Sequence, residues 1–298
     1  MGSILEILAA PFICCTGRRK LKPSKPSNSN GTSILFPLYI YPDPGCWDRV
    51  FTAVSRHPMQ HFTLVINPNS GPGPEKFPDA EYTDAIAKLN VYKNVTLIGY
   101  VHSSYGERDL TQVIAEVERY AAWASYSDLD IHVDGIFVDE APGELGEGKI
   151  NLGYLKTLHA HTKRVFQEVG LQGYFVTNPG KIVSKAFYDY ADSIVSYEAS
   201  FKTMIFPDTL FTSSDKQMSA GVNIDRQAVL IHSFDGSSRK QGELVQMLVK
   251  KGIGEVYVTS CDPGKGEGDY SRYSEHWEDF VAEMERANEA ALLDDDEM

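Results

Sequence analysis

The sequence is short of positive charge and has no long apolar run. Its 298 residues include 28 lysines and arginines against 41 aspartates and glutamates, which gives a formal net charge of −13. Binding to DNA or RNA depends on lysine and arginine side chains clustered at the phosphates, so we expect no nucleic-acid partner. No segment has the roughly eighteen consecutive apolar residues that cross a bilayer, so we expect no transmembrane helix.

Cysteine is also scarce. The four cysteines are too few for a dense disulfide framework, and Cys14 and Cys15 both lie near the start of the chain. Cys46 and Cys261 are expected to follow the first and the last strand of a closed barrel, where these two strands are neighbours. The sequence therefore predicts that Cys46 and Cys261 lie close together at one rim, either as a disulfide or as two free thiols.

Residues 1–32 differ in composition from the remainder, and we interpret them as a flexible leader. Proline, serine and asparagine dominate residues 23–30, which is typical of a linker. A secretory signal places its positive charge before its apolar stretch, whereas here the basic residues 18–20 follow it. A cleaved signal would therefore be an atypical one, and a leader without a role is an alternative.

The same leader is also compatible with a lipid anchor. Gly2, Cys14 and Cys15 offer sites for acyl chains, and basic residues follow them. Glu6 departs from the myristoylation pattern, which has serine or threonine at that position. We expect a cytoplasmic protein or one attached peripherally to a membrane through the leader, with a secreted or cell-surface protein as the alternative.

From Ser33 onward, runs rich in β-branched and aromatic residues alternate with longer segments of helical period, which indicates βα units around a parallel sheet. The expected strands are Ile34–Tyr39, Phe62–Asn67, Val95–Tyr100, Gly135–Asp139, Gly173–Thr177, Ser193–Tyr197, Ala228–Ser233 and Glu255–Thr259. The expected helices are Trp47–Arg56, Asp79–Asn90, Leu110–Ser125, Leu152–Glu168, Ser184–Tyr190, Gly242–Lys250 and Ser274–Ala291. About eight strands close a barrel filled by side chains.

The fold predicted from this pattern is α/β, a single (β/α)₈ TIM barrel over residues 33–291 with an acidic tail at 292–298. The stretch Ser200–Asn223 has poor helical period and is expected to be mostly loop. A doubly wound open sheet would show the same alternation of strands and helices. However, no Gly-x-Gly-x-x-Gly turn follows the first expected strand, which ends in an aromatic and proline-rich loop.

Acidic residues end two of the expected strands. Asp139 and Glu140 follow the apolar run 135–138, and Glu198 follows the strand 193–197. Barrel active sites lie at the carboxyl ends of the strands, and these two strands are separated by one other, so side chains that lean into the mouth can come within the ~5 to 9 Å of paired glycosidase carboxylates. An ion pair with lysine or arginine, or a cap on the next helix, is the structural alternative for either acid.

Asp139 and Glu140 are not expected to play the same part. Successive side chains of a strand point to opposite faces, so one of them should face the mouth of the barrel and the other should lie beside it. Of the two paired acids, one can protonate a leaving oxygen while the other attacks or stabilises the sugar cation.

Other strand-end residues suit a sugar, because aromatic faces cover sugar rings and amides both donate and accept hydrogen bonds. We expect substrate contacts from Tyr39, Tyr41, Asn67, Tyr100, His102, Asn178, Tyr197 and His232, with Trp47 and Tyr105 as further aromatic candidates. Asn67 and Asn178 each precede a proline, so a turn role competes with substrate binding. The histidines show no metal-ligand spacing, and we expect no metal and no cofactor.

These motifs together resemble the spherulin-4-like family of glycoside hydrolases. The segments that carry the resemblance are Phe36–Pro42, Val65–Gly73, Gly135–Pro142 and Tyr197–Glu198, and it extends over Ser33–Ala287. It implies a barrel enzyme that cleaves α-linked galactosamine-type polysaccharide internally and with retention. Carried over to this chain, Asp139 is the nucleophile or the cation stabiliser, Glu198 the general acid/base, and Glu140 an essential neighbour.

Two other functions stay open from the sequence. One is a carbohydrate-binding or cell-surface protein on the same barrel without turnover. The other is a hydrolase or lyase for a different small substrate inside the cell. The family's activity implies a secreted or cell-surface protein, and this chain departs from that pattern because it has no clear signal. We expect a polysaccharide or oligosaccharide partner and a monomeric protein.

Overall fold

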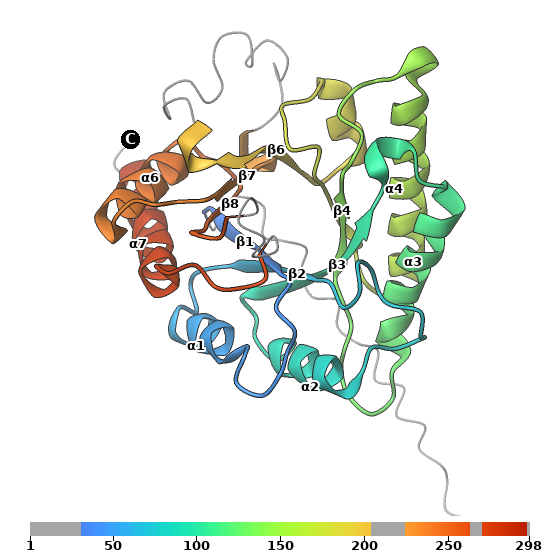
Figure 1. Cartoon of the computed structure of the whole chain (residues 1–298), viewed down its shortest axis with the longest axis horizontal. Helices are drawn as coiled ribbons and strands as arrows, with labels where there is room; N and C mark the ends of the chain where they lie inside the picture. Colours follow the sequence, from blue (N-terminus) through green and yellow to red (C-terminus); the bar gives the residue numbers. More distant parts are fainter. Residues whose placement is uncertain (1–30, 204–223, 263–269, 297–298) are drawn as a thin grey trace, which may run out of the picture.

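A computed structural model describes residues 31–203, 224–262 and 270–296. Eight parallel strands pair in chain order and close into a barrel, because β1 also pairs with β8 (Figure 1). The strands are β1 (Ser33–Leu38), β2 (Phe62–Ile66), β3 (Val95–His102), β4 (Gly135–Asp139), β5 (Tyr174–Thr177), β6 (Ser193–Ser200), β7 (Gln227–His232) and β8 (Glu255–Val258). The predicted (β/α)₈ barrel is confirmed.

Helices surround the barrel as α1 (Asp48–Arg56), α2 (Ala80–Leu89), α3 (Leu110–Ala122), α4 (Ile150–Glu168), α6 (Ser238–Lys250) and α7 (Trp277–Asp296). A 3-10 helix, Lys185–Tyr190, stands in place of the predicted helix Ser184–Tyr190. Most of the predicted leader and of the predicted loop Ser200–Asn223 lie outside the described residues. No helix in the described part of the chain has the length and apolar character of a membrane span.

Helices α6 and α7 differ most from their predicted ranges. Helix α6 starts at Ser238, ahead of the predicted Gly242, because the Ser237 side chain accepts a hydrogen bond from the backbone N–H of Lys240 and caps the helix. Helix α7 starts later than the predicted Ser274, whose hydroxyl accepts from the Ser260 backbone N–H at 3.2 Å in the preceding loop. It then continues to Asp296, past the predicted end at Ala291.

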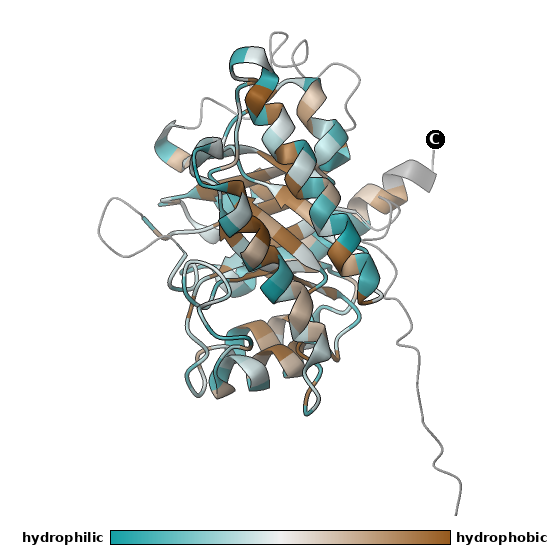
Figure 2. Cartoon of the chain, turned by 90° about the vertical axis from the view of Figure 1, so that its right-hand side faces the viewer, coloured by the Kyte–Doolittle hydropathy of each residue, from teal (hydrophilic) through white to brown (hydrophobic). Residues whose placement is uncertain are grey.

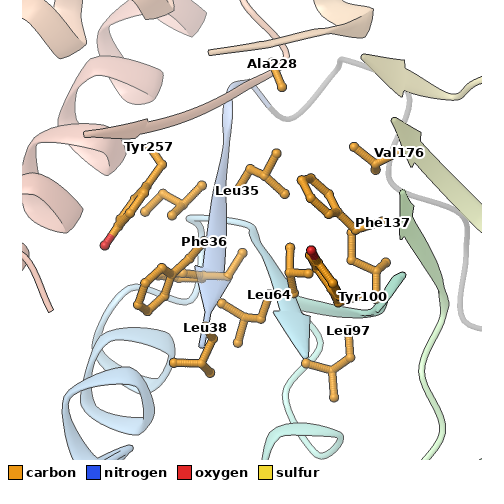
Figure 3. Close-up of a cluster of buried hydrophobic side chains, with 14 of the residues drawn as sticks. Leu35, Phe36, Leu38, Leu64, Leu97, Tyr100, Phe137, Val176, Ala228 and Tyr257 are labelled. Carbon is orange, nitrogen blue, oxygen red and sulfur yellow. The ribbon is translucent and has the colours of Figure 1, made fainter. Parts of the chain in front are cut away.

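The strands are buried on both faces, which explains their near-continuous apolar sequence. Every residue of β1 and β2 is buried. Figure 3 shows side chains from β1, β3 and β4 converging inside the barrel, among them Leu35, Tyr100 and Phe137. On the outside, Phe36 of β1 contacts Trp277 of α7 with ring centroids 4.9 Å apart. Apolar residues accordingly gather on the enclosed strands in Figure 2.

The cysteines at the rim are thiols. Cys46 follows β1 and Cys261 follows β8, as predicted, and both are free. The Tyr273 hydroxyl donates to the Cys46 carbonyl at 2.8 Å, and the Cys261 thiol contacts the Arg272 carbonyl at 3.1 Å. The same short segment therefore contacts both cysteines, and of the two forms that the sequence left open, the structure has the unbonded one.

Candidate active site

A pocket of about 360 Å³ opens at the carboxyl ends of the strands. Its lining includes six of the predicted site residues: Tyr39, Asp139, Glu140, Asn178, Glu198 and His232. The rest of the lining is Pro37, Tyr105, Phe137, Pro179, Gly180, Leu230 and Tyr270. The pocket therefore has an acidic and amide centre on a partly apolar floor.

Asn178 joins the two acids that the sequence singled out. Its side-chain nitrogen Nδ2 donates to Asp139 Oδ1 at 2.9 Å and to Glu198 Oε2 at 2.6 Å. Since one nitrogen atom lies this close to both oxygens, these oxygens are at most about 5.5 Å apart, which matches the ~5 to 5.5 Å between the carboxyls of retaining glycosidases. The acids of β4 and β6 therefore face each other over a single amide.

The orientation of the Asn178 amide follows from its other contact. The Gly180 backbone N–H donates to Asn178 Oδ1 at 3.0 Å, so the oxygen must face Gly180 and the nitrogen must face the acids. The Asn178 backbone donates to the Val138 carbonyl at 2.8 Å and accepts from the Ala141 N–H at 2.9 Å. With only 6 % of the residue exposed, Asn178 is held rigidly from both sides.

Each acid also accepts a hydrogen bond from a tyrosine hydroxyl. Tyr100 donates to Asp139 Oδ2 at 2.9 Å, and Tyr270 donates to Glu198 Oε1 at 2.5 Å. Tyr39 lies between these two rings, edge-on to both, with centroid distances of 5.4 and 6.0 Å. Burial, together with the nearby acids, raises the pKa of all three tyrosines, so they stay protonated and remain hydrogen-bond donors.

The pKa of Asp139 is raised. The largest cause is burial, which disfavours the charged carboxylate, and the charge of Glu140 acts in the same direction. Hydrogen bonds from Tyr100, the Glu140 backbone N–H and Asn178 oppose the shift. Asp139 has no ion pair in the described parts of the chain and does not cap helix α4, so the structural alternatives for this acid do not hold.

Both Asp139 and Glu140 line the pocket, so the predicted division between a facing and a lateral acid is wrong. Strand β4 ends at Asp139, and Glu140 has φ +47°, in the left-handed region. This turn interrupts the alternation of a strand. The Glu140 side chain has no hydrogen bond or ion pair within residues 31–203, 224–262 and 270–296, which leaves its carboxylate available to a ligand.

The turn at Glu140 is held by the loop that follows β3. The Glu140 carbonyl accepts from the Tyr105 backbone N–H at 2.6 Å and from the Ser103 hydroxyl at 2.9 Å. Tyr105 is itself left-handed, with φ +55°, and its side chain is 59 % exposed at the edge of the pocket. A non-glycine residue in this region costs on the order of 1–3 kcal/mol and persists only where surrounding contacts enforce it.

Five predicted contacts do not line the pocket. Tyr41 lies beyond the end of β1 and donates to Asp79 and Glu81 at the start of α2. Asn67 closes a turn, because its Oδ1 accepts from the Gly71 N–H at 2.9 Å. Two others are His102, whose ring lies 6.5 Å from that of Tyr100, and Tyr197. The fifth, Tyr100, lies behind the lining and donates a hydrogen bond to Asp139. The further candidate Trp47 is buried and donates to the Ile40 carbonyl.

A bulge in β6 explains why Glu198 faces the pocket and Tyr197 does not. The register between β6 and β7 shifts between Val195 and Tyr197. An extra residue at a bulge changes which side chains face the barrel, and bulges are frequent beside active sites. The predicted strand end at Tyr197 contained no signal of this irregularity.

Tyr270 is a functional candidate that was not predicted from the sequence. It follows β8 after a glycine-rich stretch, has φ +58° and lies outside any periodic pattern. Its position as an aromatic residue beyond a strand end was the only available signal, and that signal is shared by several residues that pack elsewhere. Within the described residues, no group of three histidine, cysteine, aspartate or glutamate side chains is arranged to hold a metal ion.

Residues 33–284 match the model of spherulation-specific family 4. The chain belongs to this family. Spherulin-4 of Physarum polycephalum is 33% identical over 174 residues, which are 58% of this chain and 46% of that protein. This chain therefore spans less than half the length of that curated relative, and the resemblance noted from the motifs is confirmed.

Solved structures agree with the family assignment. Sph3 of Aspergillus clavatus, crystallised in complex with GalNAc, is 33% identical, with a TM-score of 0.71 over 86% of this chain and 98% of its own. A chitinase of Chromobacterium violaceum has a TM-score of 0.51 at 13% identity over 86% of this chain and 99% of its own, which shows a common fold alone. This family member thus has the barrel found in carbohydrate-active proteins.

Proposed function

We propose that this protein is a retaining glycoside hydrolase that cleaves internal linkages of polysaccharides containing α-linked galactosamine or N-acetylgalactosamine. The observation that carries the proposal is the pair Asp139 and Glu198, bridged by Asn178, with oxygens at most about 5.5 Å apart. This upper bound is below the ~6.5 to 9.5 Å between the carboxyls of inverting enzymes, which make room for a water, and it supports retention. The complex of Sph3 with GalNAc supports the choice of sugar.

The proposed reaction has two displacements. The Asp139 carboxylate attacks the anomeric carbon as the bond to the leaving oxygen breaks, and Glu198 gives its proton to that oxygen. Glu198 then takes a proton from water, whose oxygen attacks the same carbon and releases Asp139. Tyr100 and Tyr270 hold the two acids, and Glu140, unpaired in the described chain, is placed to bind the sugar or to stabilise its positive charge.

Internal cleavage is supported by the rim. Tyr105 exposes most of its ring at the edge of the pocket, on the side of the Glu140 turn. An aromatic face in this position can cover a sugar unit next to the one being cleaved. A pocket with such a neighbouring surface suits a chain that continues beyond the cleaved bond.

The test uses Asp139→Asn and Glu198→Gln, with Glu144→Gln as the matched control on the same rim. The Glu144 side chain is exposed and pairs with Lys181 outside the pocket. Release of reducing ends from α-linked galactosaminoglycan should fall by roughly 10²- to 10⁴-fold in the two site variants and stay unchanged in the control. Products of the unmodified protein should keep the α configuration when first released, as followed by NMR.

Unimpaired cleavage by Asp139→Asn or Glu198→Gln would refute the catalytic assignment. Initial products of β configuration would refute retention. Binding of the polysaccharide without any release of reducing ends would instead support the alternative function, a carbohydrate-binding protein on this barrel.

A further inference from the structure

The large apolar side chains that are exposed on the described surface lie at the two ends of the barrel. Three of them, Tyr41, Tyr105 and Ile150, follow strands β1, β3 and β4 and surround the mouth. The others lie at the opposite end, which we call the base: Met59, Val91 and Leu129 in the loops before β2, β3 and β4, and Leu292 and Leu293 at the end of α7. Isolated exposed apolar residues are normal on proteins, whereas several on adjoining loops of one end can mark a contact surface.

The base loops form one connected surface. Asn94 Nδ2 donates to the carbonyls of His57 and Gln60, at 3.0 and 3.1 Å, and so ties the Val91 loop to the Met59 loop. These hydrogen bonds hold the two loops together, and Met59 and Val91 project from them with 77 % and 75 % of their area exposed. The backbone of both loops is therefore fixed while these two apolar side chains stay outside the core.

Similar hydrogen bonds connect these loops to the neighbouring loop and to the last helix. Asn90 Nδ2 donates to the Asp130 carbonyl at 2.8 Å, beside Leu129. On the other side, Asn288 of α7 donates to Gln60 Oε1 at 2.8 Å and to the Thr32 carbonyl at 2.9 Å. The exposed end of α7 is thus joined to the base, and its last turns project from the body beside the label C in Figure 2.

We propose that the base is a lipid-contact surface, into which Met59, Val91 and Leu129 insert when the protein rests on a membrane. A stable dimer buries about 800 Å² of shape-matched surface on each copy, which separate projecting tips do not provide. A bilayer takes up separate apolar side chains without matching their shape. Asp128 and Asp130 flank Leu129, so the surface fits neutral headgroups better than anionic ones.

The position of the chain start supports a membrane as the occupant. Thr32 accepts and donates hydrogen bonds with Asn288, so residues 1–30 join the barrel at the base. These 30 residues contain an apolar stretch, two cysteines and five basic residues against one acidic residue, within a chain whose net charge is −13. Its apolar stretch suits the acyl region of a neutral bilayer as well as that of an anionic one. Contact through the base also leaves the pocket, at the opposite end, open to a polymer.

The test introduces a tryptophan at each end of the full chain and uses vesicles of phosphatidylcholine with brominated acyl chains. The three native tryptophans are fully buried, so they provide a constant background. Met59→Trp at the base should be quenched on vesicle binding, whereas Ile150→Trp at the mouth, where the native residue is 71 % exposed, should not. Quenching of both residues, or of neither, would overturn the proposal even if residues 1–30 recruit the protein.

A second measurement uses charge. The double variant Met59→Glu and Val91→Glu should lower binding to phosphatidylcholine vesicles by about tenfold or more, and Ile150→Glu should leave it unchanged. Equal loss in both variants, no vesicle binding by the full chain, or a change in oligomeric state in place of vesicle binding would each refute a lipid-contact base. Cleavage of soluble polysaccharide by the double variant should be unaffected, so this result is independent of the proposed enzyme function.

Discussion

Replacing Asn178 with alanine should shift the pH dependence of catalysis. In the native site, one amide nitrogen stands between the carboxylates of Asp139 and Glu198 and donates to both, at 2.9 and 2.6 Å. Without it, two charges about 5.5 Å apart repel by about 3 kcal/mol at an effective dielectric constant near 20, or about two pKa units. Water entering the gap screens part of this repulsion.

The sign of the shift follows from the role of Asp139 as the group that must be ionised. Burial already raises its pKa, and the hydrogen bond from Asn178 opposes that rise. In Asn178→Ala the acid limb of the kcat/KM profile should therefore move to higher pH by about one to two units. The maximal kcat should fall roughly ten- to hundredfold, because the acids lose their common support.

Asn67→Ala is the matched control. Asn67 also follows a strand and precedes a proline, but its side chain closes a turn with Gly71 outside the pocket. This variant should lose about 1 kcal/mol of stability with no shift of the pH profile. Circular dichroism and thermal unfolding check that both variants fold. An unchanged acid limb in Asn178→Ala, or an equal shift in Asn67→Ala, would refute the bridging role.

Three further predictions follow from single contacts. Tyr270→Phe removes the donor to Glu198 and should lower kcat roughly tenfold with little change in KM, whereas an unchanged kcat would remove Tyr270 from the site. Tyr105→Ala should raise KM for long chains by roughly three- to tenfold but not for a short aryl glycoside, and Tyr105→Phe should restore it. Burial lowers the pKa of His132, but Asp130 and Asp134 raise it more, so its folded-state pKa lies above the ordinary value. His132 should therefore stabilise the fold below pH 6.5, and this stabilisation should decline as the pH rises through the folded-state pKa. Denaturation measurements on His132→Gln should lack this pH dependence.

The barrel and its acids were predictable because they depend on local pattern. Eight apolar strands separated by helical segments allow few folds, and Asp139 and Glu198 stand where each strand meets the mouth. Counting strands also predicted that the two acids would be close. What the pattern could not contain was the left-handed turn at Glu140, since it depends on hydrogen bonds from Ser103 and Tyr105 in another loop.

Asn67 and Asn178 also show that the local sequence does not determine the role of a residue. Both are strand-end asparagines before proline, and for both the sequence predicts a substrate contact with a turn role as the alternative. Their difference arises from the neighbouring strands, because Asn178 lies between two acids on β4 and β6 while Asn67 has the backbone of its own loop as partner. A role that is set by neighbours on other strands cannot be derived from the local motif.

The donors around Asp139 explain why its charge is available to the substrate. A lysine or arginine partner would neutralise the carboxylate, whereas Tyr100 and Asn178 are neutral: they orient it and oppose the rise of its pKa without cancelling its charge. A carboxylate held in this way keeps its full negative charge for the positive charge that develops at the anomeric carbon. Burial raises the pKa of Asp139, so a variant that placed a cation beside it, such as Asn178→Lys, should move the acid limb to lower pH and still lose activity.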